Sequence, residues 1–259
     1  ADETAIRRVV QALQPDLIVN PAAYTAVDKA ESEPALAAAI NTRAIAVFGE
    51  EAVKLGAWVI HYSTDYVFDG TKQGHYTEQD ATNPQSVYGR TKRDGELALQ
   101  QSGAKHLILR TSWVVGAHGA NFAKTMLRLA AERDSLNVVA DQFGAPTSAA
   151  LLADITAHLV RQCQREGKQT FPFGTYHLVA GGETNWCDYA RFVVGEASKA
   201  GKTLKASPET IHPITTADYP LPAPRPANSR LDTSHFRTTF GLALPEWETG
   251  VHHILQQIL

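Results

Sequence analysis

The sequence predicts an α/β fold with a largely parallel sheet. Apolar runs of strand character recur along the chain, for example at residues 17–20, 57–64 and 106–113. Between them lie longer stretches whose apolar residues fall at helical spacing. Strands that alternate with helices are typical of parallel sheets covered by helices. The order of elements therefore predicts the fold class before any motif is considered.

The first element is predicted to be a helix, because Ile6, Val9, Val10 and Leu13 fall at helical spacing. A turn at residues 15–16 leads into residues 17–20, a short apolar run typical of a strand buried on both faces. The small residues of loop 21–25 allow close approach of a flat ligand.

The second helix is predicted to reach about Leu55. Ser32 and Pro34 fit the N-cap and the first turn of this helix. Charged residues that precede it are expected to form a solvated approach rather than a site: Asp28, Lys29 and Glu31.

A helix predicted at residues 84–102 places Tyr88 and Lys92 on one face, because they are four positions apart. A cation beside a phenol lowers the phenol's pKa from about 10, which makes the group usable as a proton donor or acceptor. Strand 57–64 ends upstream at Thr64, at the sheet edge where such folds place ligands. A solvated helix face is the alternative for Tyr88 and Lys92, and a turn cap is the alternative for Thr64. Their combination favours a reductase site.

The second half of the chain continues the alternation. After strand 106–113, residues 116–122 combine glycines with a following helix and so imitate a dinucleotide-binding turn. The imitation is weak, because Phe122 stands at the third glycine position and no acidic residue closes the unit. Residues 212–226 are proline-rich and are expected to form a loop over the sheet edge. The remaining predicted elements are strands at 136–141 and 176–179 and helices at 147–166, 185–200, 233–240 and 247–259.

Composition excludes several classes of function. The 259 residues are 44% hydrophobic and 20% charged, as in ordinary globular proteins. A net charge of -3 gives no support for nucleic-acid binding. Cys163 and Cys187 are too few and too far apart to indicate a disulfide framework or a zinc site. We identify no signal peptide and no apolar run of about 18 residues, so a cytoplasmic protein without membrane partners is expected.

Several long motifs resemble those of the dTDP-4-dehydrorhamnose reductase family, within the extended short-chain dehydrogenase/reductase superfamily. Ser63-Thr64-Asp65 with Tyr88-x-x-x-Lys92 is similar to the catalytic set of that superfamily. The match runs from end to end of the chain. The segments that carry it are NPAAYTAVDKAE at 20–31, HYSTDYVFD at 61–69, RTSW at 110–113, NFAKTM at 121–126, DQFGAPT at 141–147 and RPANSRLD at 225–232.

The resemblance implies a role for individual residues. Thr64, Tyr88 and Lys92 would be catalytic, and Tyr88 and Lys92 would also contact the cofactor. Ala23, Tyr24 and Thr25 would line its nicotinamide half, although Pro21 stands where small residues are usual. Thr64, Asp65, Trp113, Arg225 and Arg230 would contact the substrate. Guanidinium groups suit diphosphate oxygens, but surface ion pairs account for the two arginines equally well, and Trp113 could instead be a core residue.

The implied activity is NAD(P)H-dependent reduction of the C4 keto group of dTDP-4-dehydro-β-L-rhamnose to dTDP-L-rhamnose, in nucleotide-sugar and lipopolysaccharide biosynthesis. The alternative is a non-catalytic, nucleotide-binding regulatory subunit of the same fold, like that of methionine adenosyltransferase. NADH and NADPH are not distinguished by the sequence. Some family members are described as using Mg²⁺ at a dimer contact, so a homodimer is a further expectation, but no carboxylate cluster places a metal.

The resemblance also implies a doubly wound, Rossmann-like parallel sheet and a smaller substrate domain interleaved with it. Residues 1–115 would be the remainder of a dinucleotide-binding domain, and residues 116–259 mainly a substrate-binding domain interleaved with late sheet elements. Family members begin with a strand, a glycine-rich turn and a helix, which we do not find before residue 20. We therefore expect ~40 further residues in the whole reductase. Without them strand 17–20 would be an open sheet edge, and NAD(P)H would bind poorly.

Overall fold

A parallel sheet of four strands forms the centre of the first half of the protein. The structure is a computed structural model and describes residues 2–259. The strands lie in the order β1 (Leu17–Asn20), β2 (Trp58–Thr64), β3 (Lys105–Thr111) and β8 (Gly174–His177). Every neighbouring pair is parallel, so the predicted sheet is confirmed. Among the described residues, β1 forms one edge of this sheet.

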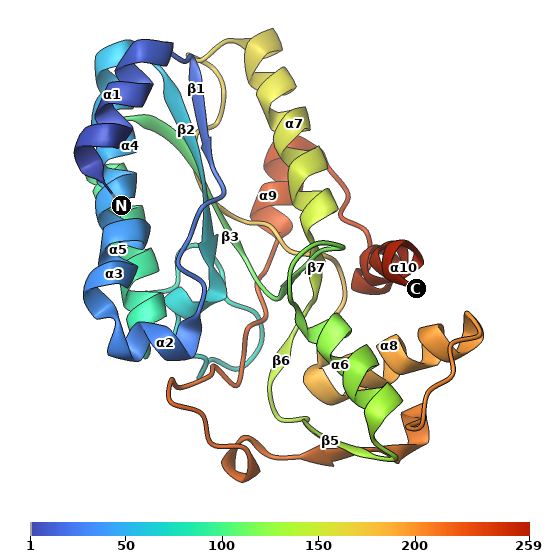
Figure 1. The fold of residues 1–259 in the computed structure, drawn as a ribbon. Helices are drawn as coiled ribbons and strands as arrows, with labels where there is room; N and C mark the ends of the chain where they lie inside the picture. Colours follow the sequence, from blue (N-terminus) through green and yellow to red (C-terminus); the bar gives the residue numbers. More distant parts are fainter. Residues whose placement is uncertain (1) are drawn as a thin grey trace.

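Helices cover both faces of the sheet (Figure 1). On one face α1 (Glu3–Leu13), α4 (Ala44–Leu55) and α5 (Val87–Gln101) pack over Val59 and Ile108. On the opposite face α7 (Ala149–Glu166) and α9 (Ser234–Phe240) pack over Ile60 and Leu109. Successive strand residues point to opposite faces, so each strand contributes to both layers. The doubly wound arrangement predicted from the sequence is therefore confirmed.

The helix predicted from Ser32 and Pro34 to about Leu55 is confirmed from Pro34 onward, but its N-cap is not Ser32. It comprises α3 (Pro34–Ala38), a π-helical turn η1 (Ala39–Arg43) and α4, and a separate short helix α2 (Val27–Ser32) precedes it. Ser32 ends α2, and its hydroxyl donates to the Lys29 carbonyl instead of capping a helix. Pro34 does occupy the first turn of α3.

The π-helical turn η1 brings Asn41 close to the backbone of α5. A Cβ added at Gly95 would lie 2.1 Å from the Asn41 carbonyl oxygen, so only glycine fits there. The Asn41 side chain donates to the Thr91 hydroxyl at 3.1 Å and accepts from the Tyr24 amide at 2.8 Å. One buried asparagine thus fixes both α5 and the loop after β1.

A second apolar core lies beside the sheet and belongs to the later part of the chain. It is built from α6 (Phe122–Glu132), α8 (Trp186–Lys199) and α10 (Trp247–Ile258). Parallel strands β5 (Leu136–Val139) and β10 (Ile211–Ile214) border it. Two further strand pairs are β4 (Val114–Val115) with β7 (Thr147–Ser148), and β6 (Phe143–Gly144) with β9 (Thr184–Asn185).

Strand β10 corrects the prediction of a loop over the whole of residues 212–226. Proline lacks an N–H and is tolerated in a strand only where that N–H is not needed for pairing. β10 pairs on one side only, with β5, so Pro213 can occupy it. The loop begins after Ile214, with a short 3₁₀ turn η4 (Thr216–Asp218).

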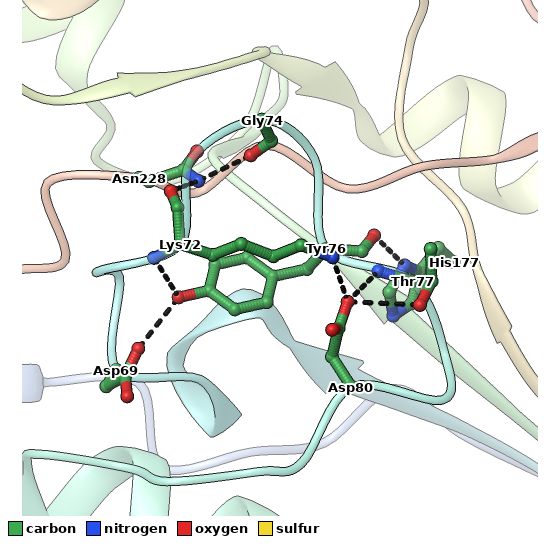
Figure 2. Close-up of polar contacts among 8 residues, drawn as sticks. All are labelled: Asp69, Lys72, Gly74, Tyr76, Thr77, Asp80, His177 and Asn228. Carbon is green, nitrogen blue, oxygen red and sulfur yellow. Dashed lines mark hydrogen bonds and ion pairs between the residues drawn. The ribbon is translucent and has the colours of Figure 1, made fainter.

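The polar loop between β2 and α5 is fixed by hydrogen bonds (Figure 2). It begins with the 3₁₀ turn η2 (Asp65–Val67). The Tyr76 hydroxyl donates to Asp69 Oδ1 at 2.8 Å, and the Asn228 amide donates to the carbonyls of Lys72 and Gly74. The loop therefore holds segment 228–232 in place against the sheet. None of the helices formed by residues 2–259 has the length and apolar character that a membrane crossing requires.

Candidate active site

A cavity of about 640 Å³ opens at the carboxyl ends of β1, β2 and β3. The C-terminal edge of a parallel sheet is the expected ligand site of such folds. Its walls come from both halves of the chain. Residues predicted for the site that line it are Ala23, Thr25, Thr64, Asp65, Tyr88, Lys92 and Trp113, whereas Tyr24, Arg225 and Arg230 lie outside its lining.

Tyr88 and Thr64 face the cavity from different elements. Ser86 caps α5 by accepting a hydrogen bond from the Gly89 amide, so α5 begins at Val87 and Tyr88 lies in its first turn. A Cβ at Gly89 would lie 2.2 Å from the Tyr66 carbonyl oxygen, so glycine lets the start of α5 approach the end of β2. This close approach places the Tyr88 phenol beside the Thr64 hydroxyl.

Burial raises the pKa of the Tyr88 phenol to about 12, and the nearby Thr64 hydroxyl lowers it by less. The expectation that Lys92 lowers this pKa is wrong for the protein by itself, because the ammonium is held elsewhere. Tyr88 is therefore protonated at neutral pH. A protonated phenol is in the correct state to give its proton to an oxygen that gains negative charge.

Lys92 is 2% exposed, and its ammonium is held by β2. Nζ donates to the Tyr62 carbonyl at 2.6 Å and lies 3.2 Å from His61 Nε2. Burial lowers its pKa to about 8, although the Glu96 carboxylate acts in the opposite direction. The side chain still reaches the cavity wall. Lys92 is thus a buried cation at the base of the site.

Asp65 is a buried carboxylic acid next to Thr64. Its side chain accepts the Thr64 hydroxyl at 2.9 Å and is 3% exposed. Burial raises its pKa to about 6, partly offset by Ser229 and Thr64. Asp65 therefore changes charge close to neutral pH inside the cavity wall.

Trp113 closes the cavity on the side of the second core. Its φ is +47°, which side chains with a Cβ adopt rarely, so the surrounding structure holds the residue in a strained conformation. The indole stacks on Trp186 with ring centroids 3.7 Å apart. A Cβ at Gly144 would lie 2.8 Å from the Trp113 ring, so a larger residue there would displace it. Trp113 is therefore a wall of the site rather than a core residue.

The loop after β1 presents its small side chains to the cavity and turns its aromatic side chain away. Ala23 and Thr25 line the cavity. The Tyr24 hydroxyl instead donates to Glu33 at 2.5 Å, while its backbone is held by Asn41. Tyr24 thus braces the loop from behind.

A second cavity of about 530 Å³ adjoins the first, because Tyr66 and Trp186 line both. Arg225 lies in its wall and pairs with Asp28 at 2.7 Å. Asp28 also accepts the Ala223 amide at 3.1 Å, so it joins α2 to the loop after β10. Asp28 stays partly exposed, as expected, but its contacts with Arg225 and Ala223 were not predicted. Glu31 is likewise half-buried, and its carboxylate accepts the Val87 amide at 2.7 Å, a contact that was not predicted.

Arg230 lies outside both cavities and is held by acceptors of its own. Its guanidinium contacts Asn228 Oδ1 at 2.8 Å and Glu183 at 3.3 Å. Segment 116–122, the weak imitation of a dinucleotide turn, does not line the first cavity, and only Phe122 reaches the second. Within residues 2–259, no group of three or more His, Cys, Asp or Glu side chains is arranged to hold a metal.

Four residues in or directly beside the site were not predicted from the sequence: His61, Tyr66, Arg133 and Trp186. Tyr66 lies edge-on to Tyr88 with ring centroids 5.4 Å apart. Arg133 follows α6 and faces the second cavity, where it makes no ion pair with the described residues. His61 and Tyr66 lie within the family-like segment 61–69, but no local pattern indicates their contacts, which cross between elements.

The fold and the site define a Rossmann-type α/β protein with a Tyr–Lys pair at its ligand cavity. The family described as "RmlD substrate binding domain" matches residues 1–259. The chain belongs to this family, and the resemblance to dTDP-4-dehydrorhamnose reductases is confirmed.

Individual relatives and solved structures agree with this family assignment. The dTDP-4-dehydrorhamnose reductase of Salmonella typhimurium (strain LT2) is 53% identical over 253 residues, covering 98% of this chain and 83% of the relative. Its counterpart in Escherichia coli (strain K12) is 52% identical over the same shares of the two chains. A crystal structure of the Clostridium acetobutylicum dTDP-4-dehydrorhamnose reductase superposes with a TM-score of 0.88 at 34% identity, covering 98% and 85% of the two chains. The Bacillus anthracis enzyme in complex with NADP gives 0.87 at 33% identity, covering 99% and 85%.

Proposed function

We propose that this protein reduces the C4 keto group of dTDP-4-dehydro-β-L-rhamnose with NAD(P)H and yields dTDP-L-rhamnose. The observation that carries the proposal is the convergence of Thr64, Tyr88 and Lys92 on one cavity at the carboxyl edge of the sheet. Relatives about half identical over nearly the whole chain are named for this activity.

The cavity has the features that a nicotinamide cofactor needs. Ala23 and Thr25 offer a wall of small side chains that a flat ring can approach, and the phenol and the ammonium suit a ribose. When bound, NAD(P)H would supply the hydride. The NADP complex of the Bacillus anthracis enzyme supports this assignment.

Tyr88 would give its phenolic proton to the substrate carbonyl oxygen as negative charge develops there. Its raised pKa keeps the proton in place until an oxygen of greater basicity appears. The Thr64 hydroxyl would orient the same oxygen. Lys92 would supply a positive field from below the site, where burial strengthens its effect.

The second cavity would receive the nucleotide part of the substrate. Arg225 lines it while paired with Asp28, and Arg133 adds a second cation, so two guanidinium groups face the space that diphosphate oxygens would occupy. Stacked Trp113 and Trp186 stand at the junction with the first cavity and would contact the sugar. Arg230, which lies outside this cavity, is the weaker candidate for the diphosphate.

The remaining expectations stay part of this proposal. Residues 1–115 would serve the cofactor and residues 116–259 mainly the substrate. The protein would work in the cytoplasm, where NAD(P)H and nucleotide sugars are found. A homodimer remains a prediction, which sedimentation would test. A use of Mg²⁺ also remains a prediction, which measuring activity in the presence of a chelator would test.

A turnover assay with dTDP-4-dehydro-L-rhamnose and NADPH or NADH tests the activity. Loss of absorbance by the reduced cofactor, with dTDP-L-rhamnose identified as product, is the expected result. Binding of the nucleotide sugar without turnover, under conditions where a known reductase is active, would contradict the proposal and support a regulatory subunit.

A further inference from the structure

A buried chain of polar contacts runs behind Lys92 and ends at β1. The Lys92 ammonium lies 3.2 Å from His61 Nε2, and His61 Nδ1 lies 3.2 Å from the Asn20 side-chain amide. Asn20 and His61 are register partners on β1 and β2, so their side chains lie on the same face of the sheet. His61 is 0% exposed. The helix carrying Tyr88 is thereby connected to the first strand.

The chemistry of the three groups determines where the protons lie. An ammonium can only donate hydrogen bonds, so His61 Nε2 must accept. Burial, followed by the nearby Lys92 charge, holds the pKa of His61 well below its usual value, so the ring is neutral with one N–H. That N–H must lie on Nδ1. It meets the Asn20 side chain, which the structure orients with Nδ2 toward the ring. Turning this amide by half a rotation lets its carbonyl oxygen accept the Nδ1 proton and gives up the 3.3 Å hydrogen bond that Oδ1 accepts from the Ala22 amide.

Two of the three ammonium protons of Lys92 are thus directed by β2. One goes to His61 Nε2, and a second goes to the Tyr62 carbonyl at 2.6 Å. The third proton is left for the open side of the ammonium, where Lys92 lines the cavity. The other ionisable groups near Lys92 are Tyr88 one turn before it and Glu96 one turn after it, both on α5.

We propose that His61 is a positioning residue that accepts a hydrogen bond from Lys92 and so directs the remaining Lys92 N–H into the cavity. Asn20 fixes the imidazole in the tautomer that this requires. His61 does not touch the substrate in this role. The effect on turnover depends on the proposed reductase activity, but the tautomer and the contact do not.

Two substitutions separate the two ring nitrogens. In His61→Gln the amide reaches the place of Nε2 and can still accept from Lys92. In His61→Asn the amide reaches only the place of Nδ1, so the contact with Asn20 is kept and the contact with Lys92 is lost. A hydrogen bond to a charged group contributes about 1.5–3 kcal/mol, so we expect kcat to fall roughly 10- to 100-fold in His61→Asn and only a few-fold in His61→Gln.

A double-mutant cycle distinguishes a positioning role of His61 from a general loss of structure. In a Lys92→Met background, His61→Asn should cause no further fall in kcat, because the group it positions is gone. Equal losses in His61→Asn and His61→Gln, or additive losses with Lys92→Met, would overturn the proposal. Circular dichroism and thermal unfolding of each variant show whether it is folded.

The wild-type protein gives a test that needs no variant and no activity. The ¹⁵N shifts of its histidines, assigned by comparison with His61→Gln, should show a neutral His61 with its proton on Nδ1 from pH 6 to 7, where Lys92 is charged. A proton on Nε2 would refute the proposal even if turnover is normal. If no turnover is found but the Nδ1–H form is observed, the reductase assignment fails and the His61 contact stands.

Discussion

Thr64 donates a hydrogen bond of 2.9 Å to Oδ1 of Asp65, which is only 3% exposed. The pKa of this carboxyl is raised to about 6 despite the hydrogen bond. The hydrogen bond does not compensate for the loss of water around the charge. Asp65 therefore lines the cavity, and its ionised form lowers the stability of the folded state at neutral pH.

Asp65→Asn should raise the free energy of unfolding at pH 7.5. The folded-state pKa of Asp65, about 6, lies above the usual aspartate value of 3.8, so the folded state binds the proton more tightly. Below pH 4 both states are protonated and carry no penalty, and the penalty grows as pH rises to 6. The shift corresponds to at most about 3 kcal/mol. Urea denaturation at pH 4.5 and 7.5 measures it.

Asp69→Asn is the matched control, because its pKa shift has the opposite sign. Hydrogen bonds from the Thr71 backbone and Tyr76 hold the Asp69 pKa at about 2. Its charge therefore stabilises the protein above pH 3.8, and this contribution is lost as pH falls through 2. Asp69→Asn should destabilise at neutral pH. A pH-independent gain in Asp65→Asn would contradict the assignment of its burial cost.

Tyr88→Phe should lower turnover while NAD(P)H affinity stays nearly unchanged. General acid catalysis contributes about 10²- to 10⁴-fold, and the phenolic proton is the group removed. Steady-state kinetics and a cofactor titration measure the two effects. Tyr24→Phe serves as a control, because that hydroxyl is bonded to Glu33 outside the cavity. Retention of most turnover by Tyr88→Phe would remove this residue from the mechanism.

Arg225→Ala should weaken binding of the dTDP sugar and leave NAD(P)H binding unchanged. Arg225 lines the second cavity, whereas Arg230 is paired with Glu183 outside it, so Arg230→Ala should have the smaller effect. Isothermal titration of each variant with dTDP measures the first affinity, and a titration with NAD(P)H measures the second. If neither substitution changes the affinity for dTDP, the diphosphate site lies elsewhere, and Arg133 is then the next candidate.

Arg110→Leu should destabilise the protein by about 3–5 kcal/mol, because it leaves the buried Glu96 carboxylate without its partner. The pair lies between β3 and α5 with side chains 6% and 2% exposed. Replacing Glu96 by Leu as well should recover most of the loss. Arg128→Leu breaks an exposed pair with Glu132 and should cost under about 1 kcal/mol. Equal losses in the two single variants, measured by urea denaturation, would contradict this account.

The fold was predictable because periodicity is local. Apolar runs gave β1, β2 and β3 at nearly the observed residues, and the four-residue spacing of Tyr88 and Lys92 placed both on the observed face of α5. The π-helical turn η1 within the predicted helix was not predictable. It lies where Asn41 contacts Gly95 of α5, and no pattern within residues 27–55 contains that contact.

The sequence predicts which ionisable groups lie at the site, but not the direction in which the pKa of Tyr88 shifts. Spacing alone indicates that an ammonium could lower the pKa of Tyr88. The outcome depends on where Nζ finds acceptors, and these are His61 and the Tyr62 carbonyl on β2. Burial then dominates and raises the pKa of the phenol. Contacts between elements decide such values, so the sequence gives the groups and the fold gives their charge states.

The ion pair that closes the site joins residues far apart in the chain and so bears on the order of folding. Ala223 and Arg225 follow their partner Asp28 by 195 and 197 positions. Because synthesis proceeds from the N-terminus and long-range contacts must overcome loop-closure entropy, these contacts form after β2, β3 and α5 have packed together. A nascent chain therefore carries Tyr88 and Lys92 in an open groove. The second cavity acquires this part of its wall only when residues 223–225 have left the ribosome.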